Sequence, residues 1–175
     1  MKKIRKIAGY SIYILIILLL TLVVKAVGFQ RTVVSGDSME STLSDGDSLL
    51  VDKISYRFSD PERFDIVVFP YSAAERVYYV KRIIALPGET VEIRDGVILV
   101  NGHVLPYKYN RDPIFDAGVA STELTLNDHE YFVMGDNVND SVDSRSYDVG
   151  NIDRSMVIGK VFLRLRPFNK FGVIE

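Results

Sequence analysis

The sequence has 175 residues, 47% of them hydrophobic and 25% charged, which is typical of a chain that folds around about one core. Its 21 basic and 23 acidic residues give a net charge of −2, which argues against general binding to nucleic acid. The lack of cysteine excludes disulfides, thiolate metal sites and thiol nucleophiles, and with only two histidines we predict no metal and no other cofactor.

The N-terminal stretch predicts a membrane anchor. Residues 7–24 carry no charge and are rich in Ile and Leu, and as a helix they would extend about 27 Å, which just spans a bilayer. Four of the six residues before this stretch are basic, which places the N-terminus in the cytoplasm. We therefore expect a cytoplasmic tip and single-pass transmembrane anchor over 1–28 and an extracytoplasmic domain over 29–175. A cleaved signal peptide is the alternative. The apolar core of a signal peptide is usually shorter than residues 7–24, however, and Lys25 interrupts the small residues where a cleavage site would lie.

The chain beyond the anchor is predicted to be mainly β. Three short β-prone runs at 91–94, 97–100 and 103–105 are separated by Asp95-Gly96 and Asn101-Gly102, dipeptides that favour two-residue hairpin turns. Further strand-like stretches bounded by turn residues cover 48–54, 65–69, 76–86, 131–134 and 157–165. No long amphipathic helical period follows the anchor, so we expect an antiparallel barrel-like or sandwich-like β domain with an irregular excursion over 106–124.

Polar residues are concentrated near glycine or proline in three segments, at 35–43, 79–89 and 135–145. Taken singly, each has an ordinary interpretation. The first can be a turn, the second an exposed strand, and the third a loop whose Asp and Ser side chains bond to their own backbone.

Strand alternation gives the second segment a more specific interpretation. One face of the predicted strand carries Lys81 in an apolar row, while Arg82 points to the other face. The other members of that row are Val77, Tyr79, Ile83 and Ala85. Burial disfavours the charged form of a lysine, which lowers its pKa from about 10.4 toward neutrality, and a neutral amine can take a proton from a serine.

The other two segments supply partners for such an amine. Ser38 follows Gly36-Asp37 in a turn that can present its hydroxyl and its own N–H to one carbonyl, as a nucleophile and an oxyanion donor must. In the third segment Asp143 and Arg145 can pair, and Asp136 and Ser141 can orient an amine or fix the loop. An aspartic pair of the two carboxylates is an alternative, but no duplicated Asp-Thr-Gly segment supports it.

The ordered set of motifs resembles bacterial type I signal peptidase, in a compact Gram-positive-like form, over nearly the whole chain. Gly36-Asp-Ser-Met-Glu-Ser-Thr-Leu43 resembles the nucleophile motif Gly-x-Ser-Met-x-Pro-Thr-Leu of that family. The stretch from Tyr79 to Gly88 resembles its lysine strand, and the stretch from Gly135 to Arg145 resembles its Gly-Asp-Asn-Arg-x-x-Ser-x-Asp-Ser-Arg segment. Three such motifs in order are far more specific than one.

The resemblance implies a membrane-bound Ser–Lys endopeptidase that cleaves signal peptides from exported preproteins after small residues of the Ala-x-Ala type. It implies that Ser38 is the nucleophile and Lys81 the general base. The oxyanion and substrate site would include Gly36, Asp37 and Met39. Ser141 would hydrogen-bond the lysine amine, and Asp143 and Arg145 would form an ion pair. Asp136 would brace the loop, and Arg82 would be structural. Its partners are preproteins and the lipid bilayer, with no nucleic acid.

Several positions depart from the family pattern. Ser41 stands where the family usually has proline, Phe64 where it has glycine, Val138 where it has arginine, and Gly36 where some relatives have serine. These departures keep open a non-catalytic or client-restricted signal-peptidase-like factor for pilus assembly. A Ser–Lys autoprotease of the DNA-damage repressor type is disfavoured, because the N-terminus is predicted to be a membrane helix and the charge offers no basic face for DNA.

Overall fold

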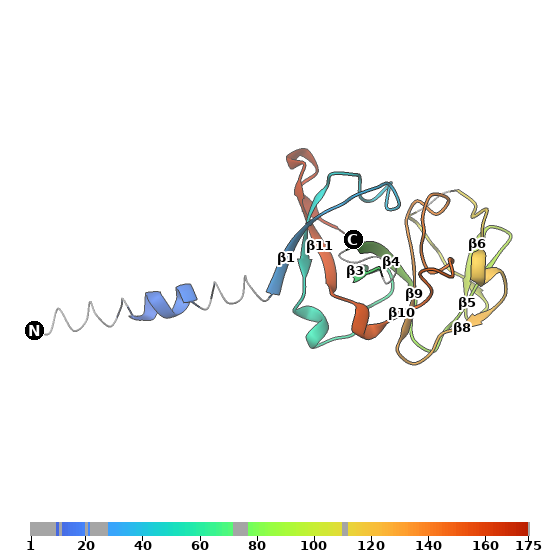
Figure 1. Ribbon diagram of the computed structural model, residues 1–175, viewed down its shortest axis with the longest axis horizontal. Coiled ribbons are helices and arrows are strands. Elements are labelled where there is room, and N and C mark those ends of the chain that lie inside the picture. Colours follow the sequence, from blue (N-terminus) through green and yellow to red (C-terminus); the bar gives the residue numbers. More distant parts are fainter. Residues whose placement is uncertain are drawn as a thin grey trace, which may run out of the picture.

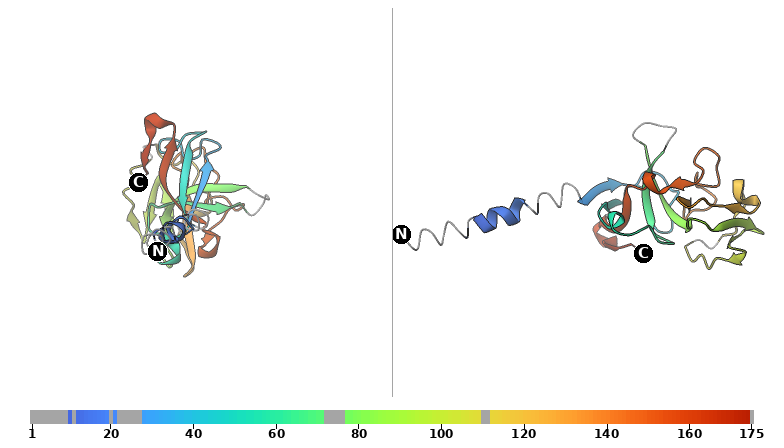
Figure 2. Two further views of the ribbon diagram at one scale, coloured as in Figure 1. Left: turned by 90° about the vertical axis from the view of Figure 1, so that its left-hand side faces the viewer. Right: turned by 90° about the horizontal axis from the view of Figure 1, so that it is seen from below.

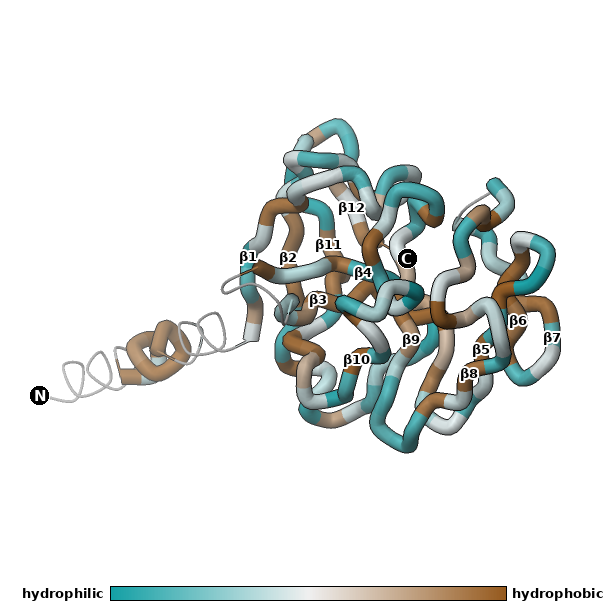
Figure 3. The backbone as a smooth tube through the Cα atoms, turned by 45° about the vertical axis from the view of Figure 1, so that its right-hand side comes forward, coloured by the Kyte–Doolittle hydropathy of each residue, from teal (hydrophilic) through white to brown (hydrophobic). Residues whose placement is uncertain are grey.

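The computed structural model describes residues 10, 12–19, 21, 28–71, 77–109 and 112–174, and its body consists of two antiparallel β lobes side by side (Figure 1). Residues 12–19 form a helical segment set apart from the β body, and the hydropathy colouring of Figure 3 shows this segment as apolar. Part of the predicted anchor over 7–24 lies outside the described residues. Among the residues that are described, no helix is both long and apolar enough to cross a membrane.

The larger lobe is built on a sheet of eight strands, all paired antiparallel. Its order is β1 (Phe29–Val33), β2 (Ser48–Asp52), β11 (Gly159–Arg166), β3 (Ile66–Pro70), β4 (Tyr78–Ala85), β9 (Glu130–Met134) and β10 (Ile152–Asp153), with β12 (Gly172–Val173) beside β11. The smaller sheet has the order β7 (His103–Val104), β6 (Val97–Val100), β5 (Thr90–Arg94) and β8 (Leu124–Thr125). Short 3-10 turns are η1 (Ser55–Arg57), η2 (Gly118–Ser121), η3 (Arg154–Met156) and η4 (Phe168–Lys170).

The predicted meander of the smaller sheet is confirmed, and its turns explain it. All four residues of Asp95-Gly96 and Asn101-Gly102 have positive φ, between 51° and 77°, as two-residue turns that match the twist of the flanking strands require. Each strand predicted in the larger lobe also has a counterpart. Strand β1 was not predicted because its residues are mostly exposed and show no clear apolar alternation.

Strand β3 shows how the larger sheet separates two cores. Ile66 and Val68 join a cluster with the turn over residues 35–43 and with β2, whereas Val67 and Phe69 join a second cluster with β9 and β10. A third cluster fills the smaller lobe and reaches back to the ends of β4 and β9. Figure 2 shows that the two lobes remain adjacent in the turned views, so β4 and β9 connect them.

Strand β4 carries the two basic residues that matter most for the site. Lys81 pairs with Val67 and Arg82 pairs with Ile66, so the two side chains lie on opposite faces of the sheet. Tyr79 and Ile83 lie with Val67 in one cluster, as the alternation predicts. The predicted row does not extend to its last member, Ala85, which packs in the smaller lobe because the pairing with β9 shifts register after Ile83.

Candidate active site

The first and second polar segments meet at a Ser–Lys contact. Lys81 Nζ donates a hydrogen bond to Ser38 Oγ at 2.6 Å, joining residues 43 positions apart in the sequence. The lysine is only 3% exposed, and in the described part of the chain its amine has no second hydrogen-bond partner and no ion-pair partner. A serine hydroxyl is therefore held against a buried amine.

Burial sets the protonation of this amine. Desolvation lowers the pKa of Lys81 to about 8; the nearby Asp143 and Asp136 carboxylates oppose this shift, and the Arg145 guanidinium adds to it. A substantial fraction of the amine is therefore neutral slightly above neutral pH, which is the state that can accept a proton from a hydroxyl.

The turn that carries the serine is fixed on both sides. Gly36 adopts a φ of +93°, which favours glycine, and its N–H donates to Asp45 Oδ1 at 2.9 Å. Met39 is almost fully buried among β2 and β3 side chains, and its carbonyl accepts the N–H of Leu43 at 2.7 Å. The N–H of Ser38 donates to no group among the described residues, so it remains available to an incoming oxygen.

Gly135 is the point where the turn that carries Ser38 meets the third polar segment. A Cβ atom at this position would lie 2.2 Å from the carbonyl oxygen of Ser38 and 2.4 Å from Ser141 Oγ, so only glycine permits both approaches. Asn137 extends this junction, because its N–H donates to the Ser38 carbonyl at 3.1 Å and its side chain donates to the Asp37 carbonyl at 3.2 Å. Neither residue was predicted to belong to the site, although both are part of the motif that begins at Gly135.

The acid in the third segment, Asp143, organises its neighbours. Its carboxylate accepts hydrogen bonds from Ser141 Oγ at 2.7 Å and from the Gly135 N–H at 3.0 Å, and it forms an ion pair with Arg145 at 2.8 Å. The expected hydrogen bond from Ser141 to the lysine amine is not among those of the described residues. A carboxylate two residues away is a stronger acceptor for the serine hydroxyl than an amine is.

Arg82 forms a separate buried network behind the site. Its guanidinium makes two hydrogen bonds to Asp136, at 2.9 and 2.8 Å, with both side chains fully buried. The Tyr107 hydroxyl donates to the same carboxylate at 2.6 Å, and the ring of Tyr109 stacks 3.4 Å from the guanidinium carbon. The two tyrosines were not predicted, since they lie in the irregular excursion where sequence periodicity carries no signal.

The positions that depart from the family pattern have distinct local settings. Ser41 has a φ of +85°, which proline cannot adopt, and its hydroxyl donates to the Tyr109 carbonyl at 2.8 Å. Phe64 has a φ of +73°, a conformation that glycine adopts without strain. Val138 is buried in the apolar cluster of the smaller lobe. The backbone at Ser41 and the core at Val138 thus fit the residues present in this chain.

The Ser–Lys contact opens into a cleft of about 300 Å³. One wall is the stretch from Thr32 to Gly36 and the other is the stretch from Tyr78 to Lys81. Among the described residues, β9 pairs with β4 only from Arg82 onward, so no described strand pairs with this edge of β4 between Tyr78 and Lys81. A free strand edge can hold an extended peptide by main-chain hydrogen bonds. Across the residues that are described, no three His, Asp or Glu side chains are grouped as metal ligands.

Comparison with known proteins gives a consistent result. The family model described as "Signal peptidase, peptidase S26" matches residues 7–166. The chain is 35% identical to "Probable signal peptidase I-2" of Synechocystis sp. (strain ATCC 27184 / PCC 6803 / Kazusa), over 89% of this chain and 74% of that protein. It is also 35% identical to "Signal peptidase I" of Bacillus licheniformis, over 90% and 87% of the two chains.

Among solved structures, a crystal structure of a signal peptidase I from Enterococcus faecalis V583 matches with a TM-score of 0.48 and 33% identity. The match covers 58% of this chain and 97% of that chain.

Proposed function

The chain belongs to the signal peptidase family, peptidase S26, and is thus a peptidase that cleaves signal peptides; from this premise we propose that Ser38 and Lys81 form its catalytic dyad. The observation that carries the proposal is the 2.6 Å contact between the serine hydroxyl and a buried amine that forms no ion pair within the described part of the chain. A lysine whose pKa is lowered to about 8 can act as a general base at the pH of the cell exterior.

The reaction follows from this geometry. Neutral Lys81 takes the hydroxyl proton as Ser38 Oγ attacks the carbonyl carbon of the scissile bond, and the unpaired N–H of Ser38 donates to the oxyanion. The protonated amine then gives its proton to the leaving nitrogen as the C–N bond breaks. A water molecule, deprotonated by the same lysine, attacks the acyl ester and releases the serine.

The substrate and its location form a second part of the proposal. The cleft has a volume of about 300 Å³ and includes Val33, Val34 and Val80 in its mixed polar and apolar lining, and this small volume suits small residues of the Ala-x-Ala type before the cut. We assign residues 1–28 to a cytoplasmic tip and membrane anchor and 29–175 to an extracytoplasmic catalytic domain. An anchored enzyme meets exported preproteins within the plane of the bilayer, which raises their effective concentration.

The test uses the full chain purified in detergent and a preprotein with an Ala-x-Ala cleavage site. Ser38→Ala and Lys81→Ala should each lower kcat/KM by about 10,000-fold, because members of a catalytic unit fail together. Ser121→Ala and Lys53→Ala serve as matched controls at positions away from the cleft and should retain full activity. Circular dichroism and melting temperature check that all four variants fold. Processing by the Ser38 or Lys81 variant at the wild-type rate would refute the dyad.

A further inference from the structure

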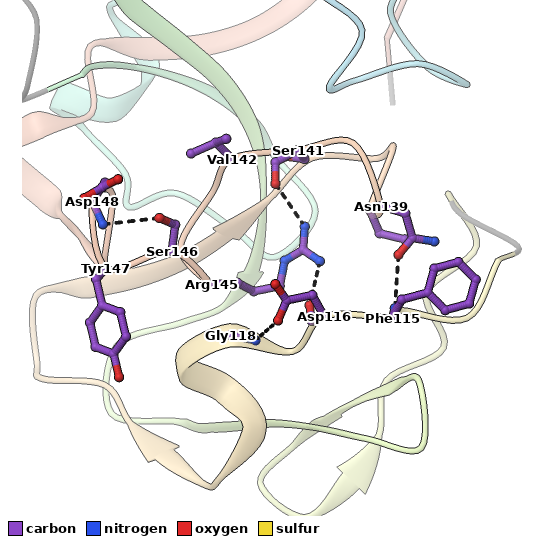
Figure 4. Close-up of a pocket in the computed structure, with 11 residues that line it drawn as sticks. Phe115, Asp116, Gly118, Asn139, Ser141, Val142, Arg145, Ser146, Tyr147 and Asp148 are labelled. Atoms are coloured by element: carbon purple, nitrogen blue, oxygen red, sulfur yellow. Dashed lines mark hydrogen bonds between the residues drawn. The ribbon is translucent and has the colours of Figure 1, made fainter.

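A second cavity lies directly beside the catalytic cleft, and we propose that it binds the first residues of the mature protein, on the far side of the scissile bond. This inference rests on the proposed function and extends it from the residues before the cut to those after it. The cavity has a volume of about 600 Å³ and lies between residues 115–118 and the loop of residues 138–148 (Figure 4).

The cavity and the cleft share a wall. Val142, which is 52% exposed, lines both of them. Ser141 lines the cavity from the next position, and its side chain and the carbonyl oxygen of Ser38 both lie where a Cβ atom of residue 135 would be. A peptide that passes Ser38 can therefore continue over Val142 into the cavity.

The direction of the peptide follows from the sizes of the two sites. The smaller cleft, between the stretch from Thr32 to Gly36 and the edge of β4, suits the small residues before the cut. Besides these two walls and residues 37–39, the described residues that line the cleft are Asp140 and Val142, and Val142 also lines the larger cavity. We therefore place the chain after the cut across Val142, so that the first mature residues, which advance about 3.3 Å each in an extended chain, lead into the cavity.

The chemistry of the cavity favours bulky and basic side chains. Phe115 and Tyr147 lie at opposite sides of the cavity in Figure 4, and their side chains, 81% and 90% exposed, leave apolar surface that a bound peptide can cover. Asp116 and Asp148 add negative charge, whereas the positive charge of Arg145 is already paired with Asp143. Aromatic side chains provide contact area and the net acidic lining provides a preference for Lys or Arg.

The first experiment compares two peptides with the same Ala-x-Ala segment, one ending at the first residue after the cut and one carrying five mature residues that include Phe and Lys. Wild-type enzyme should cleave the longer peptide with a kcat/KM about tenfold higher. The double variant Phe115→Ala/Tyr147→Ala should remove this advantage and leave cleavage of the short peptide unchanged. Phe58→Ala, at an 86% exposed aromatic residue outside the cavity, is the matched control and should keep the advantage.

The second experiment tests charge. The wild-type enzyme should prefer a peptide with Lys over one with Glu in the second to fifth mature positions by about fivefold at low salt, and the preference should shrink at 0.5 M salt. Asp148→Asn should reduce it about twofold, whereas Asp128→Asn, at an exposed acid outside the cavity, should not.

The outcomes separate this inference from the dyad. If no peptide is cleaved by the wild-type enzyme, the proposed function itself fails. If both peptides are cleaved equally well, or if the cavity variants affect both equally, the dyad stands and the inference is overturned. It is also overturned if the variants slow processing only in membranes and never with soluble peptides, because the cavity would then serve a membrane partner.

Discussion

The two faces of β4 place adjacent basic residues in opposite environments. Lys81, on one face, is buried with one hydroxyl as its hydrogen-bond partner, and burial lowers its pKa to about 8. Arg82, on the other face, is fully buried but bonded to the Asp136 carboxylate, the Phe64 carbonyl and the ring of Tyr109. One environment disfavours a positive charge and the other requires it.

The contrast shows how one strand can supply both reactivity and rigidity. A lysine can lose its proton within the range of biological pH when it is desolvated, whereas a guanidinium remains charged and forms planar, paired hydrogen bonds. The Arg82 network also contacts the two segments that flank the lysine, because Asp136 follows Gly135 and Arg82 Nη2 reaches Thr42 Oγ1 at 3.4 Å. We infer that the arginine face holds the nucleophile turn and the Gly135 loop around the lysine face.

The largest effect is expected from a substitution that disrupts the network on the arginine face. Arg82→Met should lower the free energy of unfolding by about 3–5 kcal/mol, because it leaves the carboxylate of Asp136 buried without its counterion. Urea denaturation followed by circular dichroism measures this change.

The compensating variant Arg82→Met/Asp136→Leu should recover part of the lost stability, since no unpaired charge remains. Arg94→Met removes a partner from the exposed Arg94–Glu92 pair and should leave the unfolding midpoint nearly unchanged. A similar loss of stability in both single variants would mean that the buried network contributes no more to stability than the Arg94–Glu92 pair does.

The second prediction concerns the lysine face, where a substitution should raise the free energy of unfolding and not lower it. The pKa of Lys81 is about 8 in the folded protein against an ordinary lysine value of 10.5, so below pH 8 the lysine is protonated in both states and the folded state bears the burial penalty. Lys81→Met should therefore raise the free energy of unfolding at pH 6 by up to about 3 kcal/mol, at about 1.4 kcal/mol per pKa unit.

This gain should shrink as the pH rises from 8 to 10.5, because the folded protein then holds a neutral amine while the unfolded chain is still protonated. Urea denaturation at pH 6 and pH 10 measures it, with Lys53→Met as the control at a less buried lysine. A destabilising effect of Lys81→Met at pH 6 would contradict the account given for this face.

The third prediction concerns activity on the lysine face. Because only the neutral amine is a base, kcat/KM should rise about tenfold per pH unit below pH 8 and level off above it. A peptide substrate without titrating groups between pH 6 and pH 10 gives the cleanest profile. A profile that stays level from pH 6 to pH 9 would show that Lys81 does not act through its neutral form.

The smallest effect sharpens the role of the tyrosine that stacks on Arg82. Tyr109→Leu should lower the free energy of unfolding by about 1–2 kcal/mol, because it removes a cation–π contact from a desolvated guanidinium. The Tyr109 carbonyl that accepts Ser41 Oγ is part of the backbone and is retained. Thermal unfolding measures the change, and Phe58→Leu, at an exposed aromatic residue, should have little effect. Equal shifts in the two variants would argue against the stacking contact.

Much of the fold is local enough to be predicted. The alternation of Lys81 and Arg82 and the hairpins at Asp95-Gly96 and Asn101-Gly102 depend only on strand geometry and on residues that accept positive φ. Strand β1 and the two tyrosines of the excursion could not be predicted, because their place depends on packing against distant segments. The position of Ala85 depends on a register shift, which short-range patterns do not encode.

The candidate site divides in the same way. The residue types and their order already identified Ser38, Lys81 and the Asp143–Arg145 pair as a related set, because each motif is short and its chemistry is carried by neighbouring residues. The distances between the motifs belong to the tertiary structure alone. Only the folded chain places Lys81 against Ser38 and leaves a second cavity beyond Val142, because these features join segments far apart in sequence and depend on how the sheets pack.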